Sequence, residues 1–243
     1  MAGDERPAFY ALRPGGWRDF VTILHPPYTA WHLSYVAIGA AAAPRLNGAR
    51  LGASVAAFFF AVGLSAHALD ELKGRPLGTS ISDRGLRAIA GVGLVVAVSM
   101  GAAGAVSVTP WLYAFVSFGI FIVLAYNLEM FGGRFHSDLW FAVSWGAFPA
   151  LTGYFAQAET VRWPAILVAV ACLLLSTAQR RLSTPVRRLR RGVTRVEGRM
   201  QLADGRELTI DESTLREAPE GALRVLALAL SLLAGGLVAA RLA

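Results

Sequence analysis

Long apolar runs alternate with short polar segments along most of the chain, and they predict membrane-spanning helices. Each run is close to the ~20 residues that a helix needs to cross ~30 Å of hydrocarbon. The strands of a membrane barrel would be only ~10 residues long and strictly alternating, a pattern that these runs lack. Since polar backbone groups cannot be left unpaired in lipid, the runs must be helical. About seven spans are predicted, near Tyr28–Ala43, Gly52–Leu69, Leu86–Val106, Trp111–Met130, Leu139–Gln157, Pro164–Ala178 and Ala222–Ala240.

A short amphipathic segment precedes the first span. In Trp17–Leu24, aromatic and aliphatic side chains share the segment with Arg18 and Asp19. This mixture is typical of a helix that lies on the membrane surface. Pro26 and Pro27 follow it, and because proline lacks a backbone N–H, we expect the surface helix to end before them.

The segment before the last span has a different pattern. Residues alternate in character on both sides of Asp204-Gly205, and an Asp-Gly pair flanked in this way is a strong signal for a β-hairpin. Asp211 or Ser213 is then a candidate N-cap for the helix that leads into the last span. The ~35 residues from 187 to 220 cannot bury much core of their own. We therefore expect a small insertion and not a separately folded domain.

The chain thus divides into three predicted parts. Residues 1–186 form a transmembrane helical bundle with an N-terminal interfacial helix. Residues 187–220 form a cytoplasmic basic segment with the β-hairpin, and residues 221–243 form the C-terminal transmembrane helix. The predicted fold class is an all-α integral membrane protein, in which the hairpin is the one insertion of β structure.

Composition and charge agree with this class. Hydrophobic residues make up 55% of the chain and charged residues 16%, whereas a soluble domain carries roughly 25% charged residues. With the N-terminus in the cytoplasm, the inside loops hold Lys73, Arg134 and the basic cluster 180–199, and the outside loops hold fewer basic residues. The net charge of +7 then reflects topology in a cytoplasmic membrane and contact of residues 187–191 with anionic membrane lipids, without nucleic acid.

Ionisable side chains at the end of the second span are the first candidate site. Charges within spans are costly, so they carry more functional information than charges elsewhere. His67, Asp70 and Glu71 are three and four residues apart and share one helix face. They could hold Mg²⁺ through oxygen ligands, with phosphate completing the shell. The alternative is a plain helix end, where the carboxylates meet interfacial water and pair with Lys73 or Arg75.

A second polar stretch closes the fourth span and opens the fifth. Tyr126, Asn127, Glu129, His136 and Asp138 fall in it, on the same predicted side of the membrane as the first stretch. Two acid- and histidine-bearing loops on one face are more suggestive of a site than either loop alone. Ordinary loop polarity remains the alternative for Glu129, His136 and Asp138.

Several motifs recur in an order that belongs to a known family. An amphipathic lead-in with a basic residue and proline begins at Trp17, and the second span ends in carboxylates followed by Arg-Pro-Leu and Ile-Ser. A tyrosine closes the fourth span, and the fifth contains Phe-x-x-Ser-Trp-Gly-x-x-Pro. The residues concerned are Asp70-Glu71, Arg75-Pro76-Leu77, Ile81-Ser82, Tyr126, Phe141, Ser144-Trp145-Gly146 and Pro149. From about Trp17 to Arg188, the chain resembles the UbiA-type family of intramembrane prenyltransferases.

The resemblance implies a UbiA-like helical bundle that transfers an isoprenoid chain from a polyprenyl diphosphate to an acceptor. Mg²⁺ is the implied cofactor, held by Asp70 and Glu71, and these two residues with Tyr126 are the implied catalytic residues. The implied substrate-binding residues are His67, Lys73, Arg75, Asn127, Gln179, Arg180 and Arg181. The implied partners are a polyprenyl diphosphate or another prenyl lipid, and membrane lipids.

The chain also departs from the family pattern. Its first acidic loop keeps only Asp70 and Glu71 where the family has three aspartates. The segment after the sixth span, Ser176–Pro185, contains no Asp or Glu where the family has a second acidic loop. Arg180 and Arg181 could replace a metal there by contacting phosphate directly. The family usually has nine spans, against about seven here.

Two other functions fit the same residues. One is a non-catalytic relative that binds a lipid or a prenyl quinone, or that scaffolds other membrane proteins. The other is a different membrane metalloenzyme, in which a transition metal is bound by residues of both polar stretches. Its ligands would come from His67, Asp70, Glu71, Glu129 and His136.

Overall fold

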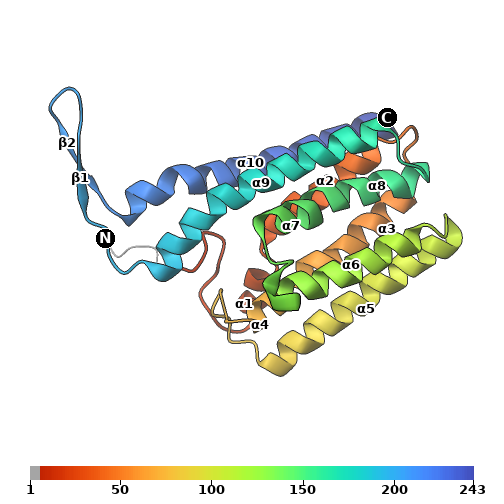
Figure 1. Ribbon diagram of the computed structural model, residues 1–243, viewed down its shortest axis with the longest axis horizontal. Coiled ribbons are helices and arrows are strands. Elements are labelled where there is room, and N and C mark those ends of the chain that lie inside the picture. The colour runs from red at the N-terminus through yellow and green to blue at the C-terminus, as the bar shows by residue number, and fades with distance from the viewer. Residues whose placement is uncertain (1–5) are drawn as a thin grey trace.

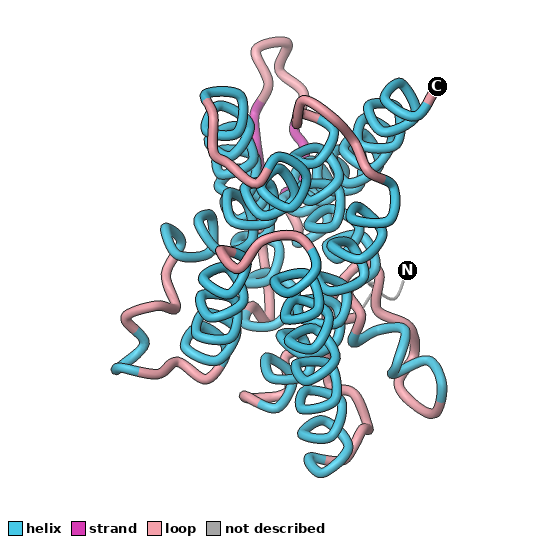
Figure 2. The backbone as a smooth tube through the Cα atoms, turned by 90° about the vertical axis from the view of Figure 1, so that its right-hand side faces the viewer, coloured by secondary structure: helices cyan, strands magenta, loops and turns pink. Residues whose placement is uncertain are grey.

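The computed structural model describes residues 6–243, which form a bundle of long helices with a β-hairpin projecting from one end (Figure 1). The helices lie side by side along the long axis, and Figure 2 shows them nearly end-on. The elements are α1 (Trp17–Ile23), α2 (Pro26–Ala41), α3 (Gly48–Phe58), η1 (Phe59–Ala66), α4 (His67–Leu72), α5 (Asp83–Ser107), α6 (Leu112–Asn127), η2 (Phe131–Gly133), α7 (Asp138–Ala142), η3 (Val143–Ala147), α8 (Phe148–Ala158), α9 (Trp163–Gly192), β1 (Gly198–Gln201), β2 (Glu207–Ile210) and α10 (Glu212–Leu242).

Four helices among the described residues are long and apolar enough to cross a membrane. They are Gly48–Leu72, Asp83–Ser107, Trp163–Gly192 and Glu212–Leu242. The other predicted spans are helical but fall short of these criteria. The helices α2 and α6 have 16 residues each, which is ~24 Å at 1.5 Å per residue. The structure therefore supports a mostly helical membrane protein, and its described residues show four candidate spans of the about seven predicted.

The local elements predicted outside the spans are present. A helix forms at Trp17–Ile23 and ends before Pro26. The strands β1 and β2 pair antiparallel, with Gly205 at positive φ in the turn between them. The Asp211 carboxylate accepts a 2.8 Å hydrogen bond from the backbone N–H of Thr214, which completes a capping box at the start of α10. The hairpin and the cap are thus confirmed.

The helix before the hairpin is longer than predicted, and the helix after it begins at the predicted cap. Helix α9 continues through Pro185 to Gly192, so the basic residues 187–191 belong to a bundle helix and not to a separate segment. Helix α10 begins at Glu212, directly after the predicted cap Asp211, and leads into the span predicted from Ala222. Both helices therefore extend past the rest of the bundle toward the hairpin (Figure 1).

A buried ion pair joins α9 to α10 in this extension. Arg190 Nε donates to Glu220 Oε1 at 2.5 Å and Arg190 Nη2 donates to Glu220 Oε2 at 3.0 Å. The two side chains are 1% and 9% exposed. Arg216 and Arg224 also approach Glu220 Oε2, at 3.7 and 3.9 Å. A bidentate arginine–carboxylate pair has a fixed geometry, so it sets how the two helices lie against each other.

Two glycines let α2 pack directly on α8. A Cβ atom added to Gly39 would lie 1.9 Å from the carbonyl oxygen of Ala150, and one added to Gly153 would lie 2.1 Å from the carbonyl oxygen of Val36. No larger residue fits at these distances. Small residues of this kind allow close backbone contact between membrane helices, where packing replaces the hydrophobic effect as the driving force.

Two helices contain π-helical segments, η1 and η3. The first ends immediately before His67, and the second includes Ser144 and Trp145. π-Helical turns are rare and are found frequently at functional sites, because the wider turn redirects the side chains around it. Both segments lie beside the cavity described below.

The loops at the hairpin end of the bundle should face one side of the membrane. We expect membrane-impermeant thiol reagents to label Glu129→Cys and Arg195→Cys from the same side, and Arg162→Cys from the opposite side. Position 129 follows α6, position 195 lies between α9 and the hairpin, and position 162 precedes α9. Cys172 is buried, so labelling of the parent protein measures the background. Labelling of positions 129 and 195 from opposite sides would contradict the fold.

Candidate functional site

A cavity of about 490 Å³ lies at the hairpin end of the bundle. Its walls come from α2, α4, α6, α9, the η3 region and the N-terminal residues 7–10. Tyrosine, histidine and arginine side chains dominate these walls. The cavity therefore gathers polar residues that are spread over almost the whole chain, at a depth where unpaired polar groups are costly.

Six of the residues predicted for the site line this cavity. They are His67, Asp70, Tyr126, Asn127, Gln179 and Arg180. The first two lie on α4, the next two close α6, and the last two lie on α9. His67, Asp70 and Tyr126 therefore lie in the wall of one cavity.

Glu71 does not line the cavity. Its carboxylate is fully buried and accepts three hydrogen bonds from the loop that follows α4. Oε2 accepts from the backbone N–H of Leu77 at 2.9 Å. Oε1 accepts from the backbone N–H and the hydroxyl of Thr79, at 2.8 and 2.9 Å. The expected convergence of Glu71 with Asp70 on a metal is therefore replaced by a structural role in the loop.

The predicted cations Lys73, Arg75 and Arg181 are not part of the cavity wall either. Lys73 Nζ lies 3.1 Å from a carboxylate oxygen of Glu129. Arg75 donates to the carbonyl oxygens of the loop that follows it and pairs with Asp83. Arg181 is exposed on α9. Lys73 and Arg75 stabilise loops because they lie beyond the end of α4, whereas Arg181 lies within α9 on its exposed side.

The aromatic side of the cavity was only partly predicted. The Tyr126 ring stacks on His136 with 4.5 Å between centroids and meets Trp145 edge-on at 5.7 Å. His136 Nδ1 lies 3.0 Å from the Tyr126 carbonyl oxygen. His136 therefore orients the end of α6, and the sequence placed it correctly near Tyr126 without assigning this contact.

Histidines and tyrosines from the N-terminal part were missed. Tyr10 Oη lies 2.7 Å from His25 Nδ1, and the His25 ring stacks on His67 with centroids 4.1 Å apart. Burial raises the pKa of the Tyr10 hydroxyl well above its usual value and lowers the pKa of the His25 imidazole well below its own. Tyr28 and His32 also line the cavity. The one feature of the sequence that pointed to these N-terminal residues was His25, which directly precedes Pro26 at the start of α2.

Several buried polar atoms in this wall have no protein partner. Nε2 of His25, Nδ1 of His32, Nδ1 of His67 and Oε1 of Gln179 make no hydrogen bond within the described residues. Buried polar groups are normally satisfied, so each such atom calls for water or a ligand. All four residues line the same cavity, which indicates that it is built to bind something polar.

The described residues do not fit a Mg²⁺ site built from two carboxylates. Asp70 is the one carboxylate among the residues that line the cavity, and Glu71 is engaged by the loop. No group of three or more His, Cys, Asp or Glu side chains within residues 6–243 is arranged to hold a metal ion. The transition-metal alternative meets the same difficulty, since Glu129 pairs with Lys73 and His136 contacts Tyr126.

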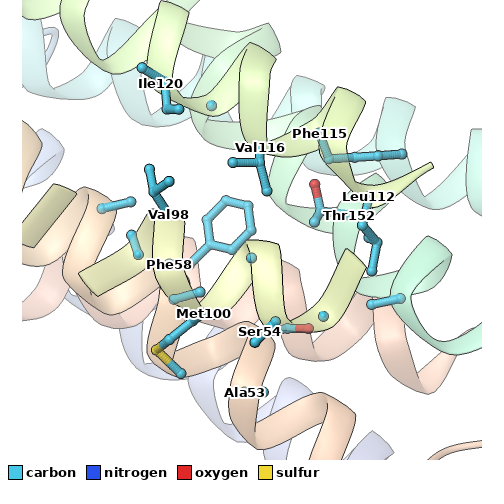
Figure 3. Close-up of a pocket in the computed structure, with 18 of the residues that line it drawn as sticks. Ala53, Ser54, Phe58, Val98, Met100, Leu112, Phe115, Val116, Ile120 and Thr152 are labelled. Atoms are coloured by element: carbon cyan, nitrogen blue, oxygen red, sulfur yellow. The ribbon is translucent and has the colours of Figure 1, made fainter. Parts of the chain in front are cut away.

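An apolar groove of about 430 Å³ adjoins the polar cavity. It lies between α3, α5 and α6, with α8 at one side, and Figure 3 shows Phe58, Val98 and Val116 among its walls. Many of its other residues are alanine or glycine, which leaves room for a ligand. Val62 and Trp145 line both the groove and the cavity. These two residues, one in each π-helical segment, therefore form a boundary shared by the two spaces.

Comparisons with known proteins give no relative: no family model, no curated protein and no solved structure matches this chain. The resemblance to UbiA-type prenyltransferases therefore stays a prediction from the motifs. The cavity and the adjoining groove are independent of it, because they follow from the positions of the side chains.

Glu71→Gln separates the structural role of Glu71 from a catalytic one. The amide nitrogen of glutamine cannot accept from the loop N–H groups, so at least one buried donor loses its partner. We expect a loss of about 2 kcal/mol in the free energy of unfolding. Glu129→Gln, which disturbs an exposed pair with Lys73, should cost less than about 1 kcal/mol. Denaturant unfolding in detergent measures both, and equal stability of the two variants would contradict the assigned hydrogen bonds.

Proposed function

We propose that this protein is a membrane-embedded prenyltransferase that binds a polyprenyl diphosphate. The observation that supports the proposal is that Val62 and Trp145 line both the polar cavity and the apolar groove, so the two spaces are neighbours. A ligand with a charged head and a long hydrocarbon chain matches this pair of spaces. The diphosphate occupies the cavity and the isoprenoid chain follows the groove.

The reaction follows from this placement. The bond between the allylic carbon and the diphosphate oxygen breaks, and its electron pair leaves with the diphosphate. An acceptor supplies the electron pair for the new bond to carbon and loses a proton. Arg180 at the cavity stabilises charge on the departing diphosphate, as fixed donors do in electrostatic catalysis. Asp70, the carboxylate in the cavity wall, takes the acceptor's proton, and Tyr126 lies beside the same space.

We further propose that all seven predicted helices cross the membrane, with the hairpin end in the cytoplasm. The basic residues of the loops and of the α9 extension gather at this end, as the positive-inside rule requires. The shorter helix α2 is then covered by neighbouring helices, and local thinning of the bilayer accommodates the length of α6.

A second function, a non-catalytic carrier of the same lipid, is favoured by one observation. Glu71, the second carboxylate of the motif, is fully engaged by backbone groups, which leaves Asp70 as a lone acid. A protein that only holds a prenyl diphosphate needs no acid at all. The two functions share the binding site and differ in turnover.

Turnover distinguishes the transferase from the carrier. We expect the purified protein to release pyrophosphate from a prenyl diphosphate when membrane extract supplies the acceptor. Asp70→Asn should lower the rate by about 100-fold or more, since proton transfer by a positioned group contributes ~10²–10⁴-fold. Asp204→Asn, in the exposed hairpin turn, is the control. Binding without release supports the carrier, and absence of binding contradicts both functions.

The groove should set which chain lengths bind. Ala97 lines the groove on α5, and Ala97→Phe should weaken binding of long prenyl diphosphates about tenfold more than binding of short ones. The matched control is Val95→Phe on the same helix, because Val95 is exposed and lies outside the groove. Isothermal titration with a series of chain lengths measures both. An equal loss of affinity for prenyl diphosphates of all lengths would show that the prenyl chain does not bind in the groove.

A further inference from the structure

Arginines of α9 form one wall of the polar cavity. Arg180, Arg187 and Arg191 are spaced seven and four residues apart, so they lie on the same face of the helix, and all three line the cavity. Arg188, the neighbour of Arg187, also lines it. The cavity wall therefore carries several positive charges from one helix, against the single carboxylate of Asp70.

These charges have little compensation within the protein. Among the described residues, Arg187 donates to the Thr184 hydroxyl at 3.3 Å, and Arg191 Nε donates to the Pro7 carbonyl oxygen at 3.2 Å. Neither makes an ion pair with a described carboxylate. Arg180 pairs with Asp138, whose side chain is 75% exposed.

A neighbouring face of α9 shows how an arginine charge is compensated in this protein. There Arg190 is matched by the buried carboxylate of Glu220, with two hydrogen bonds. Within residues 6–243, Arg187 and Arg191 make no hydrogen-bonded pair with a carboxylate, and Arg180 pairs with the exposed Asp138. Like charges gathered in a partly buried space repel one another. An anion that enters the cavity removes this cost, which makes the wall a site for a strongly negative group.

Arginine is well suited to bind a phosphate group. Its planar guanidinium presents donors in a fixed fork that matches two phosphate oxygens. Mg²⁺ would instead need carboxylate ligands from the protein, and the cavity offers Asp70 alone. The donor set is therefore complete for phosphate and incomplete for a metal ion.

We propose that Arg187 and Arg191, with Arg180, bind the phosphate groups of a diphosphate directly, without a divalent cation. For a lipid diphosphate this rests on the proposed function, because the chain needs the adjoining groove. For a diphosphate without a lipid chain, the proposal rests only on the arginines that line the cavity. The site thereby differs from one in which two acidic loops recruit metal ions to hold the same group.

The test measures binding of farnesyl diphosphate and of inorganic pyrophosphate to the full-length protein in nanodiscs. Each ligand is titrated with 1 mM Mg²⁺ and again with excess EDTA, for the parent and for Arg187→Gln and Arg191→Gln. The controls are Arg195→Gln and Arg199→Gln, whose side chains are exposed near the hairpin. Thermal unfolding of every variant verifies that it is folded.

We expect dissociation constants in EDTA within about twofold of those in Mg²⁺. Arg187→Gln and Arg191→Gln should each weaken binding about 10- to 100-fold, as expected for the loss of a charge-assisted hydrogen bond. The control variants should change it less than about twofold. Binding that requires Mg²⁺, or equal losses in the controls, overturns the proposal.

The two ligands separate this inference from the proposed function. If both ligands bind without metal and farnesyl diphosphate binds more tightly than pyrophosphate, the result supports both the arginine site and the proposed function. Equal metal-free binding of both ligands keeps the arginine site and removes the support for a lipid substrate. Binding of farnesyl diphosphate only with Mg²⁺ keeps the lipid substrate and overturns the metal-free site. Failure of both ligands to bind overturns both.

Discussion

Where α2 crosses α8, the two backbones touch, because Gly39 and Gly153 leave no side chain between them. This contact fixes α2 in the interior of the bundle, where it also packs along α10. His32 of α2 is thereby held near Trp145 of η3, with ring centroids 6.4 Å apart. The wall of the polar cavity thus depends on helix packing that involves no polar group. In lipid, such contacts are what hold helices together.

Much of the helical architecture is encoded in local patterns that can be read from the sequence. Apolar runs, the Asp204-Gly205 turn and the Asp211 cap each act over a few residues, and the structure shows a helix, a turn or a cap at each place. Whether a helix crosses the membrane depends on more than its local sequence. Helix α2 is short and mostly buried by its neighbours, so its own composition does not establish that it spans.

The sequence could predict only those site residues whose positions follow from helical spacing. Seen along the axis of α4, Asp70 and Glu71 lie on either side of His67, because residues three and four positions away are rotated from it in opposite directions. Which side faces the cavity depends on the loop to Thr79, which folds back over Glu71. Tyr10 reaches the cavity from a segment without periodicity, so no helical pattern could place it.

For the proposed lipid ligand, the apolar groove has a consequence for how one chain is selected over another. A hydrocarbon chain leaving water gains about 0.8 kcal/mol per methylene, but a chain already dissolved in the bilayer exchanges one apolar solvent for another. Transfer into the groove between α3 and α5 therefore provides little net partition energy. Discrimination between chains then depends on how well each chain packs against Phe58 and Val116 (Figure 3).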